Sequence, residues 1–216
     1  MFNNYLVNYI FVSIFFISCQ ERERHETIEK QWTGEDRTTL LTGFQESQAL
    51  LMDLVRPLSN EQWYFKADSN SWSIADIMEH LGLQEDMHFR EVYVISKTPM
   101  RPELLEKTKN NDDKVLAYET DPTKGTSGWF VTPRGRWCSK EEAIQGFNRS
   151  RDHTIDFVGN TDIDLRLHFT FRDIPDENDF RRVRDLHQIL LTTITHTKRH
   201  IHQIERIKNH PDFPNP

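Results

Sequence analysis

Apolar residues recur at steps of three and four along most of the chain, which is the spacing of one face of an α-helix. The first such segment has Thr33 as its expected N-cap and ends near Pro57, because proline cannot continue a helix. A second segment follows Ser73, which forms a capping box with Asp76, and extends to about residue 96. We therefore predict two long helices in the first half of the chain.

The second half predicts two further helices. Ser139 and Glu142 have the spacing of another capping box, and they begin a helix that we expect to end near residue 158. The last helix is expected over residues 179–208, before the final prolines. Between these two helices, residues 162–179 are polar and mixed, and the sequence LRLHFTF within them fits either a strand or a buried loop.

Residues 97–137 interrupt the helical pattern with four of the nine prolines and three of the eight glycines. We expect one helical turn near residues 102–107 and otherwise a long crossover, which could lie over a functional site because loops of this length are often functional. The sequence therefore predicts an all-α fold, a four-helix bundle with a long crossover between the second and third helices.

The N-terminal residues have a different composition. Residues 1–20 contain no charged side chain, and 5–17 are nearly all apolar, which as a helix would span only about 20 Å. Ser18, Cys19 and the charged run ERERHE then resemble a bacterial lipoprotein signal, although no Lys or Arg precedes the apolar run. We expect an apolar leader over 1–19, with Cys19 as its lipidation site, a polar tether over 20–32 and a bundle over 33–210.

Composition limits the kind of chemistry. The 216 residues include 14 Phe, 5 Trp and 5 Tyr, enough bulky groups for a core, and the formal net charge of −7 gives no general attraction to nucleic acid. Two cysteines cannot form a disulfide framework or a thiolate zinc site. The ten histidines are therefore the first candidates for chemistry.

Three histidines fall on apolar helix faces. His196 and His200 are four residues apart, about 40° on the helix, on the face that also holds Ile189 and Ile204. His80 shares a face of the second helix with Ile77 and Leu81. His88 is less well aligned with His80, whereas His187 and His202 point away from the paired histidines. We predict that His80, His196 and His200 are the candidate ligands.

Two imidazoles one turn apart can bind one ion, and a third from a facing helix would complete a three-histidine site with open positions. The alternative is a set of hydrogen-bonded core histidines, and spacing alone leaves both interpretations open. Burying an unpartnered ring costs about 1–3 kcal/mol, a cost that a cation removes. Because a ligating imidazole must be neutral, we expect metal affinity to fall below about pH 6.5.

Two segments give the chain a family resemblance. WSIADIMEHLGLQE resembles the second-helix segment, and HTKRHIHQIERIK the fourth-helix segment, of the DinB/YfiT-like superfamily of metal-dependent hydrolases and thiol transferases. The resemblance covers roughly residues 33–208. It implies a four-helix bundle in which one histidine of the second helix and two of the fourth bind a divalent ion, here His80, His196 and His200. It also allows a homodimer.

The resemblance implies a metal-dependent hydrolase or transferase. We expect a small-molecule substrate, since the net charge of −7 does not favour nucleic acid. Zinc or nickel is favoured by the imidazole ligands, with iron or manganese as alternatives. Gln84, Glu85 or Gln203 could orient a ligand or water, and no general base is assigned. Cys138 is expected to be a half-buried structural thiol. The alternative function is a non-catalytic metal-binding or partner-binding bundle of the cell envelope.

The leader predicts export as a membrane-anchored lipoprotein, with the cytoplasm as the alternative location. If Cys19 is lipidated, Cys19→Ser should release or mislocalise the protein while its metal content stays unchanged, because the predicted helix caps all follow the tether. Cell fractionation combined with metal analysis measures both effects. An intact mass for an unprocessed chain in the cytoplasm would contradict export and would favour the thiol-transferase interpretation.

Overall fold

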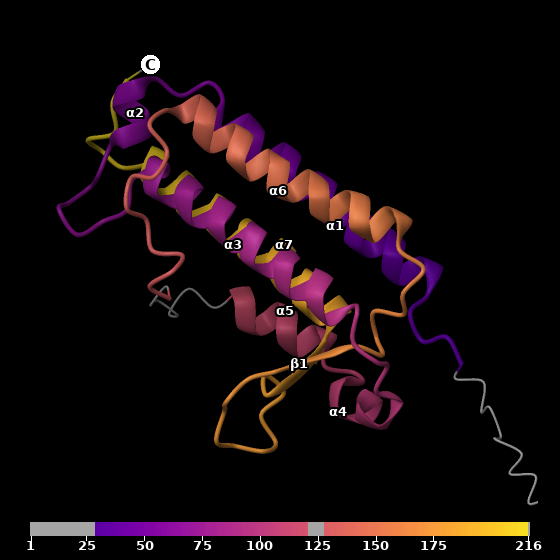
Figure 1. Cartoon of the computed structure of the whole chain (residues 1–216). Coiled ribbons are helices and arrows are strands. Elements are labelled where there is room, and N and C mark those ends of the chain that lie inside the picture. The colour runs from indigo at the N-terminus through magenta and orange to yellow at the C-terminus, as the bar shows by residue number, and fades with distance from the viewer. Residues whose placement is uncertain (1–28, 121–127, 216) are drawn as a thin grey trace, which may run out of the picture.

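The structure is a computed structural model that describes residues 29–120 and 128–215. The predicted leader and most of the predicted tether lie outside these residues. Four long helices form the bundle: α1 (Gly34–Val55), α3 (Ile74–Ile95), α6 (Lys140–Asn160) and α7 (Leu186–Lys208). Each of them packs on two of the others, since α1 and α3 both contact α6 and α7 (Figure 1). The prediction of an all-α four-helix bundle with a long crossover is confirmed.

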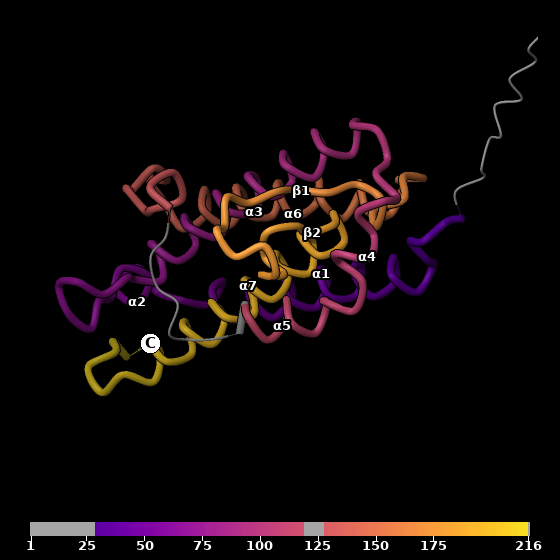
Figure 2. Tube along the Cα trace, turned by 90° about the horizontal axis from the view of Figure 1, so that it is seen from below, coloured from indigo at the N-terminus to yellow at the C-terminus, as the bar shows by residue number. Residues whose placement is uncertain are grey.

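Shorter elements lie at the ends and along one side of the bundle. They are α2 (Asn60–Tyr64), the 3₁₀ turn η1 (Pro102–Leu104), α4 (Leu105–Thr108), α5 (Asp112–Thr120), β1 (Phe169–Phe171) and β2 (Val183–Asp185). The helical turn expected near residues 102–107 is present as η1 and α4, whereas α5 was not predicted. Helix α5 packs along α7, so the crossover adds a fifth helical segment beside the bundle (Figure 2).

Local capping explains where the helices begin. The boxes at Thr33 and Ser73 are both complete, with the side chain and backbone of each cap bonded to the third helical residue. Ser139 caps α6 through the Glu142 amide, but the Glu142 carboxylate accepts a 2.8 Å hydrogen bond from the Cys138 amide instead of the Ser139 amide. The third capping box is therefore incomplete, contrary to the prediction.

The predicted start of the last helix at residue 179 was wrong. Helix α7 begins at Leu186, because the Asp185 side chain accepts a 2.8 Å hydrogen bond from the Gln188 amide and acts as the N-cap. The residues just before it form β2, which pairs antiparallel with β1, the end of the LRLHFTF sequence. Pairing between distant segments thus replaces a helical turn that the local sequence allowed.

The core consists of two apolar clusters along the bundle axis. One includes Trp63, Met78 and Phe147, and the other includes Trp32 and Phe44. All five side chains are at most 1% exposed, so both clusters contribute the hydrophobic stabilisation expected of a close-packed interior. None of the helices in the described part of the chain is long and apolar enough to cross a membrane.

A buried arginine joins the two clusters. The Arg151 guanidinium lies about 5 Å from the rings of Phe44 and Phe147 and forms a bidentate ion pair with Glu85, at 2.8 and 2.9 Å. Its remaining donors bond to the Phe44 carbonyl and to the hydroxyls of Ser47 and Thr197, at 2.8–2.9 Å. All five N–H donors of Arg151 are therefore used, and the network connects α1, α3, α6 and α7.

Removing one member of this ion pair should be costly. Arg151→Met leaves the buried Glu85 carboxylate without its cation, so we expect the free energy of unfolding to fall by about 3–5 kcal/mol in urea denaturation. The double variant Glu85→Gln/Arg151→Met should recover part of this loss, since no unpaired charge remains. Arg90→Met, which breaks the exposed i,i+4 pair with Asp86, is the control and should change stability little. If Arg151→Met and Arg90→Met lose the same free energy of unfolding, the stabilising role assigned to the Arg151–Glu85 pair is contradicted.

Candidate metal centre

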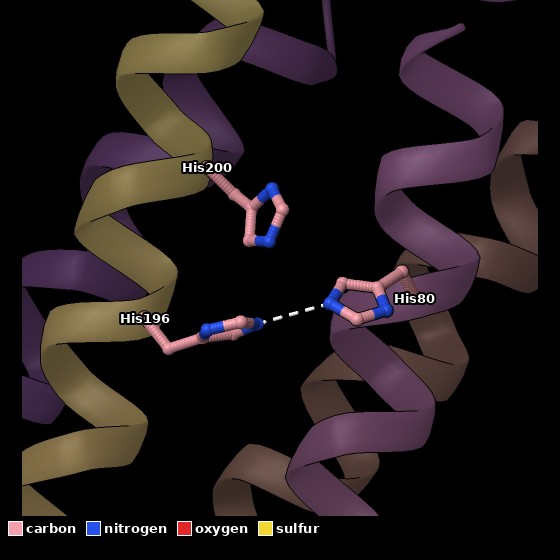
Figure 3. A group of neighbouring side chains, drawn as sticks. All are labelled: His80, His196 and His200. Atoms are coloured by element: carbon pink, nitrogen blue, oxygen red, sulfur yellow. Dashed lines mark hydrogen bonds between the residues drawn. The ribbon is translucent and has the colours of Figure 1, made fainter. Parts of the chain in front are cut away.

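The three predicted histidines lie together between α3 and α7. One ligand atom from each of His80, His196 and His200 lies within 4.8 Å of the others, and the rings face a common space (Figure 3). The Nε2 atoms of His80 and His196 are 3.0 Å apart. His80 and His200 are each 3% exposed. The two α7 histidines are one turn apart and α3 presents His80 opposite them, as the helical spacing predicted.

The outer nitrogens of two rings fix the proton positions. His80 Nδ1 lies 2.9 Å from the Val131 carbonyl oxygen, and His200 Nδ1 lies 2.7 Å from Gln203 Oε1. Both oxygens can only accept, so each Nδ1 bears the proton and donates it. The Nε2 atoms of His80 and His200 are then left with lone pairs, which is the arrangement in which a histidine binds a metal through one nitrogen and is oriented through the other.

One of these lone pairs has no partner. His200 Nε2 is buried and makes no hydrogen bond within the described residues. An unpartnered polar atom in a protein interior costs about 1–3 kcal/mol, so such atoms are uncommon and call for an explanation. A cation shared with His80 and His196 supplies the missing partner. The residues present therefore fit a divalent ion, and no rearrangement of the side chains is required to bring the three rings together.

The electrostatic environment keeps the rings neutral. Burial lowers the pKa of all three histidines, to about 3 for His200 and well below its usual range for His196. The neighbouring imidazoles and the Arg199 guanidinium lower the pKa values of His196 and His200 further. The expectation that metal affinity falls below about pH 6.5 stays a prediction, and these lowered pKa values favour an onset of that fall at a lower pH. The rings remain deprotonated, and available to a metal, at more acidic pH than free histidine.

Trp72 forms an aromatic wall beside the cluster. Its ring centroid lies 5.0 Å from that of His80, and 6.3 Å from that of His200 with an interplanar angle of 16°. Trp72 belongs to the loop directly before α3 and is half-buried. The site is thus bordered by two long helices, one loop aromatic residue and the crossover carbonyl of Val131.

A family model described as the DinB superfamily matches residues 44–204. The chain belongs to the DinB superfamily. No curated protein and no solved structure matches it. The matched region contains His80, His196 and His200, and the superfamily is associated with metals. This DinB chain therefore has a three-histidine cluster that could hold a metal ion.

The crossover of this DinB bundle is attached to α3 directly beside the cluster. The Glu79 carboxylate accepts hydrogen bonds from the backbone amides of Arg134, Gly135 and Arg136, at 2.8–3.1 Å, and pairs with the Arg136 guanidinium. Gly135 has a φ of +69°, a left-handed conformation that favours glycine. Because His80 follows Glu79, the same turn of α3 holds both the crossover and the candidate site.

Trp137 fixes the end of the crossover between two helices. Its ring fills a notch made by Gly82 on α3 and Gly146 on α6, where an added Cβ would come within 2.2 and 2.5 Å of the indole. A larger side chain at either glycine would displace the indole. The crossover is therefore held at two points that directly follow Val131, and Val131 contacts the histidine cluster, as the length of the crossover suggested.

The other residues considered in the sequence have separate roles. Gln203 orients His200, whereas Glu85 is committed to Arg151 and Gln84 bonds to His88. The remaining candidates divide by exposure: His88 and His187 are buried, and His202 and Cys138 are exposed. Cys138 is thus not the half-buried thiol that was expected. No pattern in the sequence indicated Val131, because a backbone carbonyl can come from any residue type.

The lowered pKa of His200 should make the stability of the metal-free protein depend on pH. The unfolded chain takes up the proton first, near its ordinary pKa of 6.5, whereas the folded chain does so near about 3. The stability contributed by the neutral ring is complete above pH 6.5 and is lost as the pH falls toward about 3. With a chelator present, His200→Gln should therefore lose less free energy of unfolding between pH 7.5 and pH 5 than the wild-type chain. Urea denaturation measures these free energies, and equal losses in His200→Gln and the wild-type chain would contradict the prediction.

Proposed function

We propose that this DinB-superfamily protein is a metal-dependent enzyme of hydrolase or transferase type, in which His80, His196 and His200 hold one divalent ion. The observation that supports this most strongly is the buried Nε2 of His200, which has no partner among residues 29–120 and 128–215. It lies beside the Nε2 atoms that face each other on the other two rings. A structural histidine cluster would be expected to satisfy its own lone pairs, whereas a ligand set leaves them for the ion.

Three protein ligands leave coordination positions open for a substrate or solvent molecule. A divalent ion held there lowers the pKa of a coordinated water or thiol and so supplies a nucleophile at neutral pH. The chain itself contributes the neutral imidazoles, since burial lowers their pKa values, and the orienting acceptors Val131 and Gln203. The half-buried Trp72 ring offers a surface on which an apolar part of a substrate can pack.

Zinc or nickel is the proposed ion, because three imidazoles suit these borderline cations, with iron or manganese as alternatives. We propose a small-molecule substrate, since the net charge of −7 does not favour nucleic acid. The location proposed is the cell envelope, through a lipid on Cys19, and there water is a more available nucleophile than a low-molecular-weight thiol. A homodimer is compatible with this proposal.

A second candidate is a metal-binding bundle without catalytic activity. It is favoured by one observation on α3, where two acidic residues near His80 in sequence have other partners. Glu79 is bound by the crossover amides and Arg136, and Glu85 by Arg151. Neither carboxylate is available as a general base in this arrangement. A nucleophile generated at the ion would then need its proton to pass to solvent or to the substrate.

Metal binding is the first test of the proposed function. Purified full-length protein should bind about one equivalent of Zn²⁺ or Ni²⁺, and His200→Gln should weaken binding by at least about 100-fold, because loss of a ligand exceeds the cost of losing an outer-shell partner. His202→Gln is the matched control, since this exposed histidine lies on the same helix. Isothermal titration calorimetry and metal analysis measure both. Equal affinities in the two variants, or no uptake by the wild-type chain, would refute the site.

Activity assays separate the two candidate functions. The loaded protein should hydrolyse generic ester or amide substrates, or consume a thiol in the presence of an electrophile, and a chelator should abolish the reaction. Stoichiometric metal without turnover in either assay would support the non-catalytic bundle.

A further inference from the structure

Gln84 lies next to the histidine cluster, between two contacts that join α3 to α7. On one side of it, His80 meets His196, with 3.0 Å between their Nε2 atoms. On the other side, His88 Nδ1 lies 2.8 Å from Thr193 Oγ1. Gln84 is one helical turn from each of these two α3 histidines, and the helices run antiparallel. Gln84 therefore lies along α3 between the two residues that make these contacts with α7.

A chain of hydrogen bonds fixes the orientation of the Gln84 amide. Thr193 Oγ1 donates its single proton to the Ile189 carbonyl at 3.0 Å, so it accepts from His88 Nδ1. His88 Nε2 then bears a lone pair, and it accepts a 2.9 Å hydrogen bond from Gln84 Nε2. The two polar atoms of an amide diverge by about 120° from their common carbon, so the Gln84 oxygen is directed away from His88.

The environment of His88 supports this arrangement. Burial is the main cause that lowers the pKa of His88 to about 4, against the opposing effect of Glu91, and Arg172 and Arg184 lower it as well. A neutral ring can donate only through one nitrogen, so the same pattern of donors and acceptors persists at pH values near 7. Gln84 therefore has a fixed orientation although its side chain is only half-buried.

The amide oxygen of Gln84 is an available acceptor. Within the part of the chain that the structure describes, no donor bonds to Gln84 Oε1, and the only partner of this side chain is His88. The interior side of α3 is occupied by Glu85 and Arg151, whereas Gln84 reaches the accessible side. A strong acceptor without a partner among the described residues thus belongs to the side chain one helical turn from His80, and His88 and Thr193 set its orientation.

We propose that Gln84 is a positioning and specificity-determining residue: its side-chain oxygen accepts a hydrogen bond from a ligand that shares the ion with His80, His196 and His200. This proposal rests on the proposed metal site and defines its ligand class as molecules with an O–H, N–H or S–H group. An amide cannot take up a proton at neutral pH, so Gln84 selects and orients such a group and does not act as a base.

The test compares two small anions that bind to metals and differ in hydrogen-bond donors. Acetohydroxamate retains an N–H group when it chelates an ion, whereas azide has no donor. Their affinities for the Co²⁺-loaded full chain are measured by visible absorption. Gln84→Met should lower the affinity for acetohydroxamate by about fivefold, which corresponds to the loss of one hydrogen bond, and should change the affinity for azide by less than about twofold. Gln48→Met, on α1 with its amide bonded to Asn148, is the matched control and should leave both affinities unchanged.

Variants at Thr193 test the hydrogen-bond chain. Thr193→Val removes the acceptor for His88 Nδ1, which allows the ring to donate through Nε2 and the Gln84 amide to turn over. Thr193→Val should lower the affinity for acetohydroxamate as Gln84→Met does. Thr193→Ser keeps the hydroxyl and should bind acetohydroxamate with the wild-type affinity. A general structural effect would lower both affinities together.

Several outcomes would overturn the proposal. Gln84→Met that weakens the two anions equally, or neither, would show that the amide oxygen makes no selective contact. If Thr193→Val binds acetohydroxamate as tightly as the wild-type protein does, the chain of hydrogen bonds through His88 does not orient the Gln84 amide. If the wild-type chain takes up no Co²⁺, the metal site fails together with this proposal. Uptake of Co²⁺ with unselective binding overturns the role of Gln84 alone.

Discussion

The buried ion pair between Arg151 and Glu85 is the interaction on which the bundle and the site both depend. Two charges in an apolar interior are stabilising only when every donor and acceptor is satisfied, and here all five guanidinium donors have partners. The partners come from the other three long helices, α1, α3 and α7. Glu85 and Thr197 both bond to Arg151, and these bonds set the rotation of α3 and α7 about their axes. Glu85 directly follows Gln84, and Thr197 directly follows His196. That rotation turns His80 and His196 toward each other.

The Arg151 network and the histidine cluster, both inside the bundle, differ in how far their polar atoms are paired. The Arg151 network is complete, as a structural element must be, whereas the histidine cluster includes a buried nitrogen that has no partner in the part of the chain that the structure describes. Natural sequences follow local and global rules together except at functional or strained sites, which makes this difference informative. The incomplete cluster is positioned by the complete network, through Thr197 on α7. A complete structural network thus lies beside the candidate site.

The parts of the structure that the sequence predicted depend on local information. Thr33 and Ser73 define helix starts within four residues, and the 3.6-residue period places His196 and His200 on one face. The errors arise from distant partners. Asp185 caps α7 at the end of a strand whose partner lies across a loop, so no local pattern marks it. The Arg151–Glu85 pair spans 66 residues, and charged residues rarely indicate their partners in sequence. Burial likewise lowered the histidine pKa values in a way that spacing could not show.

Residues 79–85 of α3 connect these features within two helical turns. Successive side chains on a helix point about 100° apart, so neighbouring positions face different elements. Glu79 holds the crossover, His80 meets α7, and Glu85 faces α6 and the bundle interior. A rotation of α3 would break all three sets of contacts at once. The geometry of the histidine cluster is therefore coupled to the stability of the bundle and to the attachment of the crossover, and a change in the site cannot occur through α3 without disturbing the fold.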